Sequence, residues 1–391
     1  MNLFTASNQW ANRPADERFW TLEEMLKVTT DYAANACQAV VKMQDLTVSP
    51  SPLGLSIATQ KGTSANLSNW GFQQVCNRVS APAGYLSRLP AANAAQCLNY
   101  GLQNADDDGA NTKILFNKNP DTSLLVRAFT SDRYSRIWNR DIMQRLVDLP
   151  SQGWQVPPAR PVASVKAVDG SNTRIATEED CLRLQHPGLS IKPGDIIAPA
   201  GLYASNHDMF AFLVNEQHID DGTEGGLGRG VFVQNSEVGA AAFKVTRFLY
   251  RYICGNHIVW DASEVKELRI VHKGRANSRF GSELVAELRQ YGNQSAGIEE
   301  GRIATAKRVE IGSNKDEVLD RLFGKKQLGL SRTILDAAYV DARREADTTG
   351  INPRSVWGMV QGITSVARSL PYADDRNALD RSAGKLMSID F

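Results

Sequence analysis

The stretch from Gly230 to Trp260, GVFVQNSEVGAAAFKVTRFLYRYICGNHIVW, constrains the fold more than any other part of this chain. Apolar residues alternate in GVFVQNSEVG, a pattern typical of a strand that is buried on one side. The following FKVTRFLYRYIC is apolar enough to enter a core but also carries cations. The sequence therefore predicts that a buried element and a charged surface form at the same place.

The cations of this stretch suit either of two secondary structures. Lys244, Arg247 and Arg251 are spaced i, i+3, i+7, so a helix would gather them on one face near Tyr250, whereas a strand would divide them between two faces. The helical arrangement suits a phosphate backbone with stacked bases. The alternative is an amphipathic core element with a solvated basic rim, which is common on surface helices.

A second segment, RAFTSDRYSRIWNRDIMQR, repeats this pattern. It predicts a strand at 124–129, followed by a helix that begins near Ser131 or Asp132 and ends near Leu149. The helix N-terminus is itself a favourable place for a phosphate. Local pairing of the arginines with aspartates is the alternative. One face of the helix would carry Arg133, Arg136 and Arg140, with Tyr134 and Trp138 between them.

Charge is nearly balanced over the whole chain, with 44 Lys and Arg against 43 Asp and Glu and a net charge of +1. This balance argues against a protein that coats nucleic acid or an anionic membrane with its whole surface, so any polyanion site must be a local patch. The main local excess is eight basic residues against three acids, formed by Lys244, Arg247, Arg251, Lys266, Arg269, Lys273, Arg275 and Arg279.

The five cysteines are scattered and include no CxxC pair, so neither a disulfide framework nor a cysteine-rich zinc site is indicated. We therefore expect a cytoplasmic protein, located in the host cell cytoplasm if a phage encodes it. No segment approaches the roughly 18 apolar residues that a membrane span needs, and the N-terminal residues do not resemble a signal peptide.

A metal or catalytic site would need side chains that converge, and the sequence offers one scattered set for it. The spacings in this set match no known ligand or nucleophile motif, and isolated histidines are commonly hydrogen-bonded structural residues. The Gly226–Gly230 segment lacks the Gly-Lys-Ser/Thr of a phosphate loop, so a hairpin connection is the preferred interpretation. The set consists of His207, Asp208, Glu237, His257 and His272.

The order of elements predicts an α+β fold, with a mostly antiparallel sheet flanked by helices and a helical C-terminal third. A capping box at Thr21–Glu24 predicts a helix to about Gln44 that buries Val40 and Val41. Strands are predicted in DLTVSP and LGLSIATQ, and a hairpin joins 195–204 to 209–214. The expected divisions are an N-terminal helix and strand segment at 1–60, an α+β core at 61–280 and a helical region at 281–391.

Several segments together resemble a family found in phages, plasmids and prophages, catalogued as domain of unknown function 932. The similarity lies in NWGFQQVCNRVSAPAGYLSRLP, RAFTSDRYSRIWNRDIM, GVFVQNSEVG, RYICGNHIVW, LRIVHKG and VWGMVQGITSVAR. The chain departs from the family where Gln361-Gly-Ile-Thr364 replaces an Asn-Ala-Val-Thr run. The resemblance implies a mobile-element protein that serves phage or plasmid DNA metabolism, and it assigns no activity to individual residues.

The leading hypothesis is a phage- or plasmid-type protein that binds single-stranded DNA, with strand annealing in recombination as its expected use. It would act as a homo-oligomer without a cofactor, and would expose its two runs of cations on one common surface. The alternatives are a metal-dependent enzyme acting on nucleic acid or nucleotide, and a counter-defence protein that binds a host protein through its helical C-terminal third. The nucleic-acid-binding residues would be Arg133, Tyr134, Arg136, Trp138, Arg140, Lys244, Arg247, Tyr250, Arg251, Lys273, Arg275 and Arg279.

Overall fold

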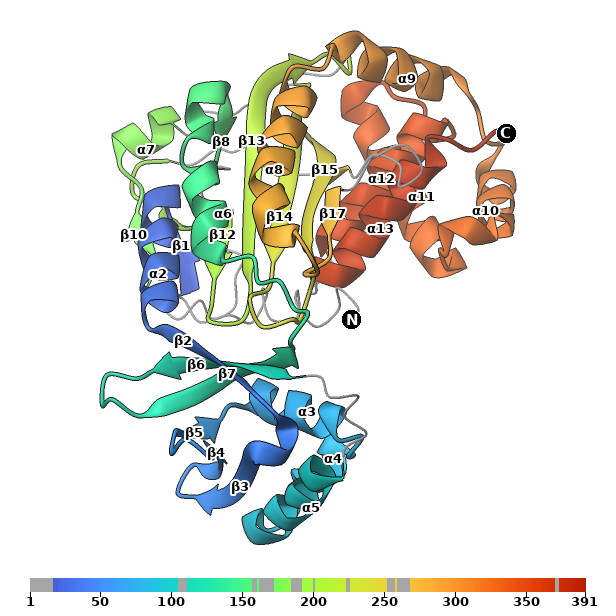
Figure 1. Ribbon diagram of the computed structural model, residues 1–391. Helices are drawn as coiled ribbons and strands as arrows, with labels where there is room; N and C mark the ends of the chain where they lie inside the picture. Colours follow the sequence, from blue (N-terminus) through green and yellow to red (C-terminus); the bar gives the residue numbers. More distant parts are fainter. Residues whose placement is uncertain are drawn as a thin grey trace.

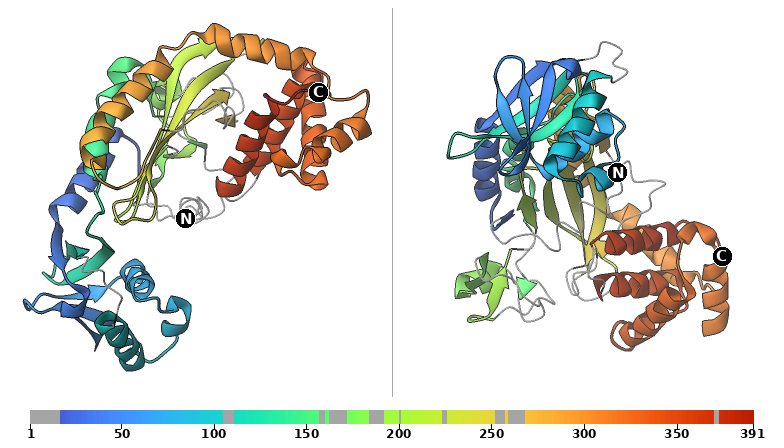
Figure 2. Two further views of the ribbon diagram at one scale, coloured as in Figure 1. Left: turned by 45° about the vertical axis from the view of Figure 1, so that its right-hand side comes forward. Right: turned by 90° about the horizontal axis from the view of Figure 1, so that it is seen from below.

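The protein is an α+β protein built from three units that follow one another along an arc (Figures 1 and 2). A small α+β unit lies at one end, a large antiparallel sheet lies in the middle, and a group of helices lies at the other end. The computed structural model describes residues 17–104, 111–156, 160–161, 172–183, 192–199, 201–222, 226–251, 257–258, 268–369 and 373–391.

The small unit is a six-stranded sheet with helices α3 (Asn69–Arg78), α4 (Ala83–Leu86) and α5 (Ala91–Gln103) against one face. The two strands predicted from DLTVSP and LGLSIATQ pair as β3 and β4, and the strand predicted at 124–129 lies in β7, which pairs with β6. The strand order is β2 (Ala36–Val41), β6 (Thr112–Lys118), β7 (Leu124–Ser131), β5 (Ser64–Leu67), β4 (Gly54–Thr59) and β3 (Leu46–Ser51).

Helix α2 (Leu22–Ala34) leads into this unit and begins where the capping box predicts. The backbone N–H of Glu24 donates to Thr21 Oγ1 at 3.2 Å, and Glu24 Oε2 accepts from the Trp20 N–H at 2.9 Å. The predicted extension to Gln44 is wrong. Val40 and Val41 lie in β2 instead, because β-branched residues favour strands and β6 supplies a partner.

The central sheet is antiparallel throughout, in the order β1 (Arg18–Phe19), β12 (Leu202–Ala204), β13 (Met209–Ile219), β14 (Leu227–Asn235), β15 (Phe243–Arg251) and β16 (His257–Ile258). The predicted hairpin is confirmed, since β12 and β13 pair across 205–208. Further strands β8 (Trp154–Gln155) and β17 (Leu268–Ile270) pair with β13 and β15. A separate small sheet contains β9 (Arg160–Pro161), β10 (Arg174–Ile175) and β11 (Ile196–Ala198), near α7 (Glu178–Arg183).

One face of the central sheet is covered by α2, α6 (Asn139–Leu146) and α8 (Ala276–Gly292) (Figure 1). Alternate residues point to this face, because side chains alternate along a strand. Val231 and Val233 of β14 and Phe243 and Val245 of β15 are completely buried there. The even-numbered residues of these strands therefore face away from α8.

The C-terminal third is helical, as the sequence predicts. It contains α9 (Ala296–Arg308), α10 (Lys315–Gly324), α11 (Arg332–Thr349), α12 (Val356–Ser369) and α13 (Ala373–Leu386). Their core also takes in Leu227 and Leu249 from the central sheet. The boundary expected after residue 60 falls between β4 and β5 of one sheet, and that after residue 280 falls inside α8.

Candidate nucleic-acid interface

The first cationic segment does not form the predicted helix. After β7 the chain continues without helical structure until α6 begins at Asn139, so the predicted start near Ser131 or Asp132 is wrong. An isolated bridge between Tyr134 and Lys273 holds this segment against the chain that follows β17. The N–H of Ser135 donates to the His272 carbonyl at 2.9 Å. Distant partners therefore satisfy backbone groups that a helix would have satisfied locally.

The second cationic segment is a strand, so its cations do not share a helix face. Lys244 lies opposite Arg269 of β17 on the sheet face away from α8, whereas Arg247 points to α8 and pairs with Glu287 at 2.6 Å. Tyr250 and Arg251 end β15 next to its pairing with β16, and their side chains lie outside the described part of the structure.

Two of the predicted binding residues are structural cations. Arg136 is 6% exposed. Its guanidinium donates to the Glu237 carbonyl and lies 5.3 Å and 5.5 Å from the ring centres of Tyr134 and Trp138. Burial lowers the pKa of Arg136. Arg247 lies 4.8 Å from the Tyr291 ring centre in addition to its ion pair. Their positive charges are used inside the fold.

The predicted stacking rings are also used inside the fold. Tyr134 stacks on His272 with ring centres 4.9 Å apart, and its hydroxyl donates to the Ser236 carbonyl at 3.0 Å. Burial raises the pKa of Tyr134. Trp138 is half-buried and packs against Leu115 and Ala128. These two rings connect the small unit to the central sheet.

Glu237 lies at the centre of this connection. The sequence patterns did not predict this structural role for it. One carboxylate oxygen accepts from Arg127 at 2.8 Å, and the other accepts from the Asn139 N–H at 2.7 Å. The next carbonyl, that of Val238, accepts from Trp70 and Gln74. Three segments far apart in the sequence thus meet here. A charged residue directly after a buried strand was the signal in the sequence.

Exposed cations of the first cationic segment and of the chain around β17 lie near one another. Arg133 follows β7 and is carried to the chain after β17 by the Tyr134–Lys273 bridge. Gly274 has a φ of +58°, a left-handed turn that suits glycine and leads directly into α8. We call Arg133, Arg269, Lys273 and Arg275 the basic patch. Within the described part of the chain, none of these four side chains is in an ion pair.

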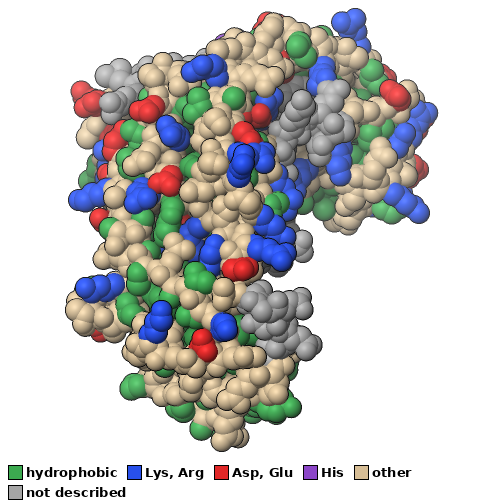
Figure 3. Space-filling view, viewed as in Figure 1, with side chains coloured by type: hydrophobic (Ala, Val, Ile, Leu, Met, Phe, Trp, Pro, Cys, Tyr) green, Lys and Arg blue, Asp and Glu red, His purple; other side chains and the backbone are tan. Residues whose placement is uncertain are grey.

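Figure 3 shows Lys and Arg side chains gathered over the lower end of α8 and β17, beside the hollow between the small unit and the C-terminal helices. Around the basic patch, Lys113 donates to the Tyr134 carbonyl at 3.1 Å, and Arg279 pairs with Glu283 at 2.7 Å. Arg140 pairs with Asp141 at 3.0 Å. The predicted site therefore divides into exposed, ion-paired and buried cations.

Asp208, Glu237 and His272, which were considered for metal chemistry, are bound to other groups of the fold. Glu237 and His272 belong to the buried connection, whereas Asp208 accepts from Ser205 at 2.9 Å beyond β12. The side chain of His257 lies outside the described residues. Among the residues that the structure describes, no group of three or more His, Cys, Asp or Glu side chains could hold a metal ion.

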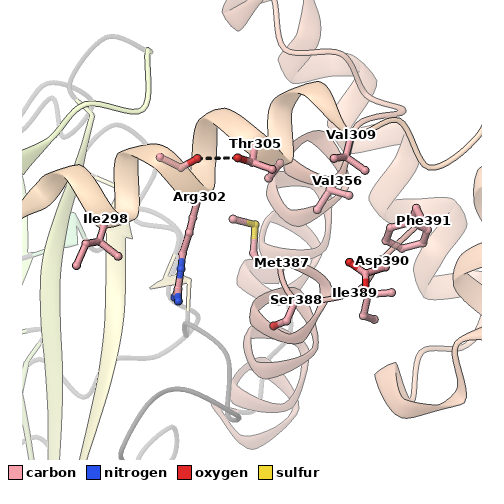
Figure 4. Close-up of a pocket in the computed structure, with 12 residues that line it drawn as sticks. Ile298, Arg302, Thr305, Val309, Val356, Met387, Ser388, Ile389, Asp390 and Phe391 are labelled. Atoms are coloured by element: carbon pink, nitrogen blue, oxygen red, sulfur yellow. Dashed lines mark hydrogen bonds between the residues drawn. The ribbon is translucent and has the colours of Figure 1, made fainter.

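A cavity of about 470 Å³ lies between α9 and the C-terminal residues (Figure 4). Its lining mixes apolar side chains, including Val309, Val356 and Met387, with polar ones such as Arg302, which extends from α9. None of the described helices is both long enough and apolar enough to span a bilayer. Comparisons with family models, curated proteins and solved structures found no match to this chain.

Proposed function

We propose that this chain binds single-stranded nucleic acid through the basic patch, as a phage- or plasmid-type protein of DNA recombination. The observation that supports the proposal is the backbone bridge between Tyr134 and Lys273, which brings the chain that carries Arg133 next to the chain that carries Lys273 and Arg275. Exposed cations without carboxylate partners attract a phosphate backbone because each contact releases bound counterions. Lys244 adjoins the patch through Arg269 and extends it along the sheet.

The test is fluorescence anisotropy with labelled single-stranded DNA, RNA and duplex DNA over a salt series. The change is a triple charge reversal, Arg133→Glu, Lys273→Glu and Arg275→Glu. Each phosphate contact in a single strand contributes about 0.7 to the slope of log K against log salt, so losing three should reduce that slope by about 2. We also expect affinity to fall at least tenfold at low salt.

A matched variant reverses three exposed cations outside the basic patch: Lys61→Glu, Lys326→Glu and Arg343→Glu. It has the same net charge as the patch variant, so it controls for long-range electrostatics. Equal losses in both triple variants would refute a local site. Absence of binding by the wild-type protein at low salt would refute the proposed function itself, and preference for duplex DNA would refute the single-strand assignment.

A further inference from the structure

The outer edge of β2 has backbone groups that are suited to strand addition. β2 ends the strand order of the small unit and pairs with β6 on one side. The Asn35 carbonyl accepts from the Lys118 N–H at 2.8 Å. Because hydrogen-bonded residues alternate along an antiparallel pair, the N–H and C=O groups of Ala36, Gln38 and Val40 point away from β6. Among the described residues, none of these outward groups has a backbone partner.

The opposite edge of the same sheet is closed. On β3, the Val48 N–H donates to Asn99 Oδ1 at 2.7 Å, and Asn99 Nδ2 donates to the Val48 carbonyl at 2.8 Å. The side-chain amide thus takes the place of a neighbouring strand. Pro50 lies further along β3 and lacks an N–H with which to pair. Proteins commonly protect edge strands in such ways.

β2 has none of these protections in the described structure. Its sequence, ACQAVV, contains no charge and no proline, and its register with β6 runs from Ala36 to Val41 without a bulge. Gln38 is exposed, and Val40 is 57% exposed. An uncharged, regular and exposed edge of this length is a template for another strand. The described edge strands of the other two sheets span only two or three residues.

We propose that β2 is the interface between two copies of this chain, which pair antiparallel about a two-fold axis at Gln38. This register pairs Gln38 with its own copy and places Ala36 opposite Val40, so no like charges face each other. Lys42 would lie opposite Ala34 in the last turn of α2, which contains no basic residue. A cation there is favourable because the C-terminal end of a helix carries partial negative charge. The two six-stranded sheets would join into one.

The test is sedimentation velocity of the full chain over a range of concentrations. The wild-type protein should form dimers reversibly. Gln38→Lys places two cations directly opposite each other at the axis, so we expect its dissociation constant to rise at least tenfold. The matched Gln38→Thr keeps an uncharged, strand-favouring residue and should still dimerise. Circular dichroism checks that both variants are folded, which we expect because position 38 is exposed.

Cysteine cross-linking tests the register in a Cys37→Ser background. Gln38→Cys should give a disulfide dimer on mild oxidation, whereas Val40→Cys should not, because Val40 faces Ala36 of the other copy. A wild-type protein that stays monomeric would overturn the proposal, and so would a dimer that Gln38→Lys leaves intact. These outcomes are independent of nucleic-acid affinity, because the basic patch contains no β2 residue.

Discussion

Arg133 and Arg136 are three residues apart, but their environments are opposite. Arg133 is exposed in the basic patch, whereas Arg136 is buried between two aromatic rings and the Glu237 carbonyl. Helical periodicity assigns them to one face, but an extended segment separates them. At the residue scale, the bridge at Tyr134 therefore determines which of the two arginines is exposed. The spacing of arginines in the sequence does not.

His272 predicts how stability depends on pH. Burial, with Arg136 nearby, lowers the pKa of its imidazole from 6.5 to about 4. Between these values the unfolded chain binds the proton more strongly, so stability is fully present above about pH 6.5 and falls as pH drops towards 4. The full contribution is roughly 3 kcal/mol. We expect His272→Phe, which retains a ring against Tyr134, to weaken this dependence.

The measurement is urea unfolding at several pH values between 4 and 6.5, compared between the wild-type protein and His272→Phe. The difference between the two proteins removes the shared titration of the carboxylates. Identical pH profiles would show that His272 is not a buried neutral group. Preserved dimerisation and nucleic-acid binding at neutral pH are expected in the variant, because His272 is only 4% exposed.

At the scale of elements, the pairing of β14 with β15 depends on a glycine. Gly230 lies opposite Phe248, and a Cβ at Gly230 would lie 2.1 Å from a carbon of the Phe248 ring. Phe248 is only 3% exposed, which restricts its movement. We expect Gly230→Ala to reduce the free energy of unfolding by about 1–3 kcal/mol through overpacking.

The double variant Gly230→Ala, Phe248→Leu tests this cause by chemical denaturation. A smaller side chain at position 248 makes room for the new methyl group, so the double variant should lose less stability than the sum of the single variants. Strictly additive losses would show that the contact between these two positions is not the reason. If the double variant loses less stability than that sum, Gly230 is required for packing against Phe248 and not for a phosphate-binding loop.

Local signals predicted some elements well, and long-range pairing determined the others. The start of α2 follows from the Thr21 capping box, which involves neighbours in sequence. The strand at Val40 and Val41 depends on β6, whose residues come some seventy positions later. The sequence singled out Arg133, Lys273 and Arg275 among candidate binding residues. It could not separate them from Arg136 and Arg247, because burial in this fold depends on distant partners.

At the scale of the whole molecule, buried ion pairs mark both ends of β14. Near its start, Arg229 pairs with Glu299 of α9 at 3.4 Å, which links the central sheet to the C-terminal helices. Just beyond its end, Glu237 pairs with Arg127 of β7 at 2.8 Å, which links the sheet to the small unit. Breaking one partner of a buried pair leaves an uncompensated charge and costs about 3–5 kcal/mol. The three units should therefore unfold together.

Cys76 provides a probe of this coupling, because it is fully buried in the small unit and burial raises the pKa of its thiol to about 11. With Cys37, Cys97, Cys181 and Cys254 replaced by serine, thiol labelling in urea reports the opening of the small unit, while circular dichroism follows the helices. We expect both transitions to coincide in this background. Glu237→Ala leaves Arg127 without its carboxylate partner, so Cys76 should become reactive at lower urea than the loss of helical signal.

The matched variant Glu283→Ala removes a surface partner of Arg279 and should keep the two transitions together, because exposed pairs contribute at most about 1 kcal/mol. If Glu237→Ala shifts both transitions equally, the small unit is held by its apolar contacts, and Glu237 adds stability without coupling. If only the Cys76 transition moves, one carboxylate fixes the small unit against the central sheet. The same carboxylate then also holds the chain that carries Arg133 near Lys273. Arg133 and Asn139 both lie in the chain from β7 to α6, and the Asn139 N–H donates to Glu237.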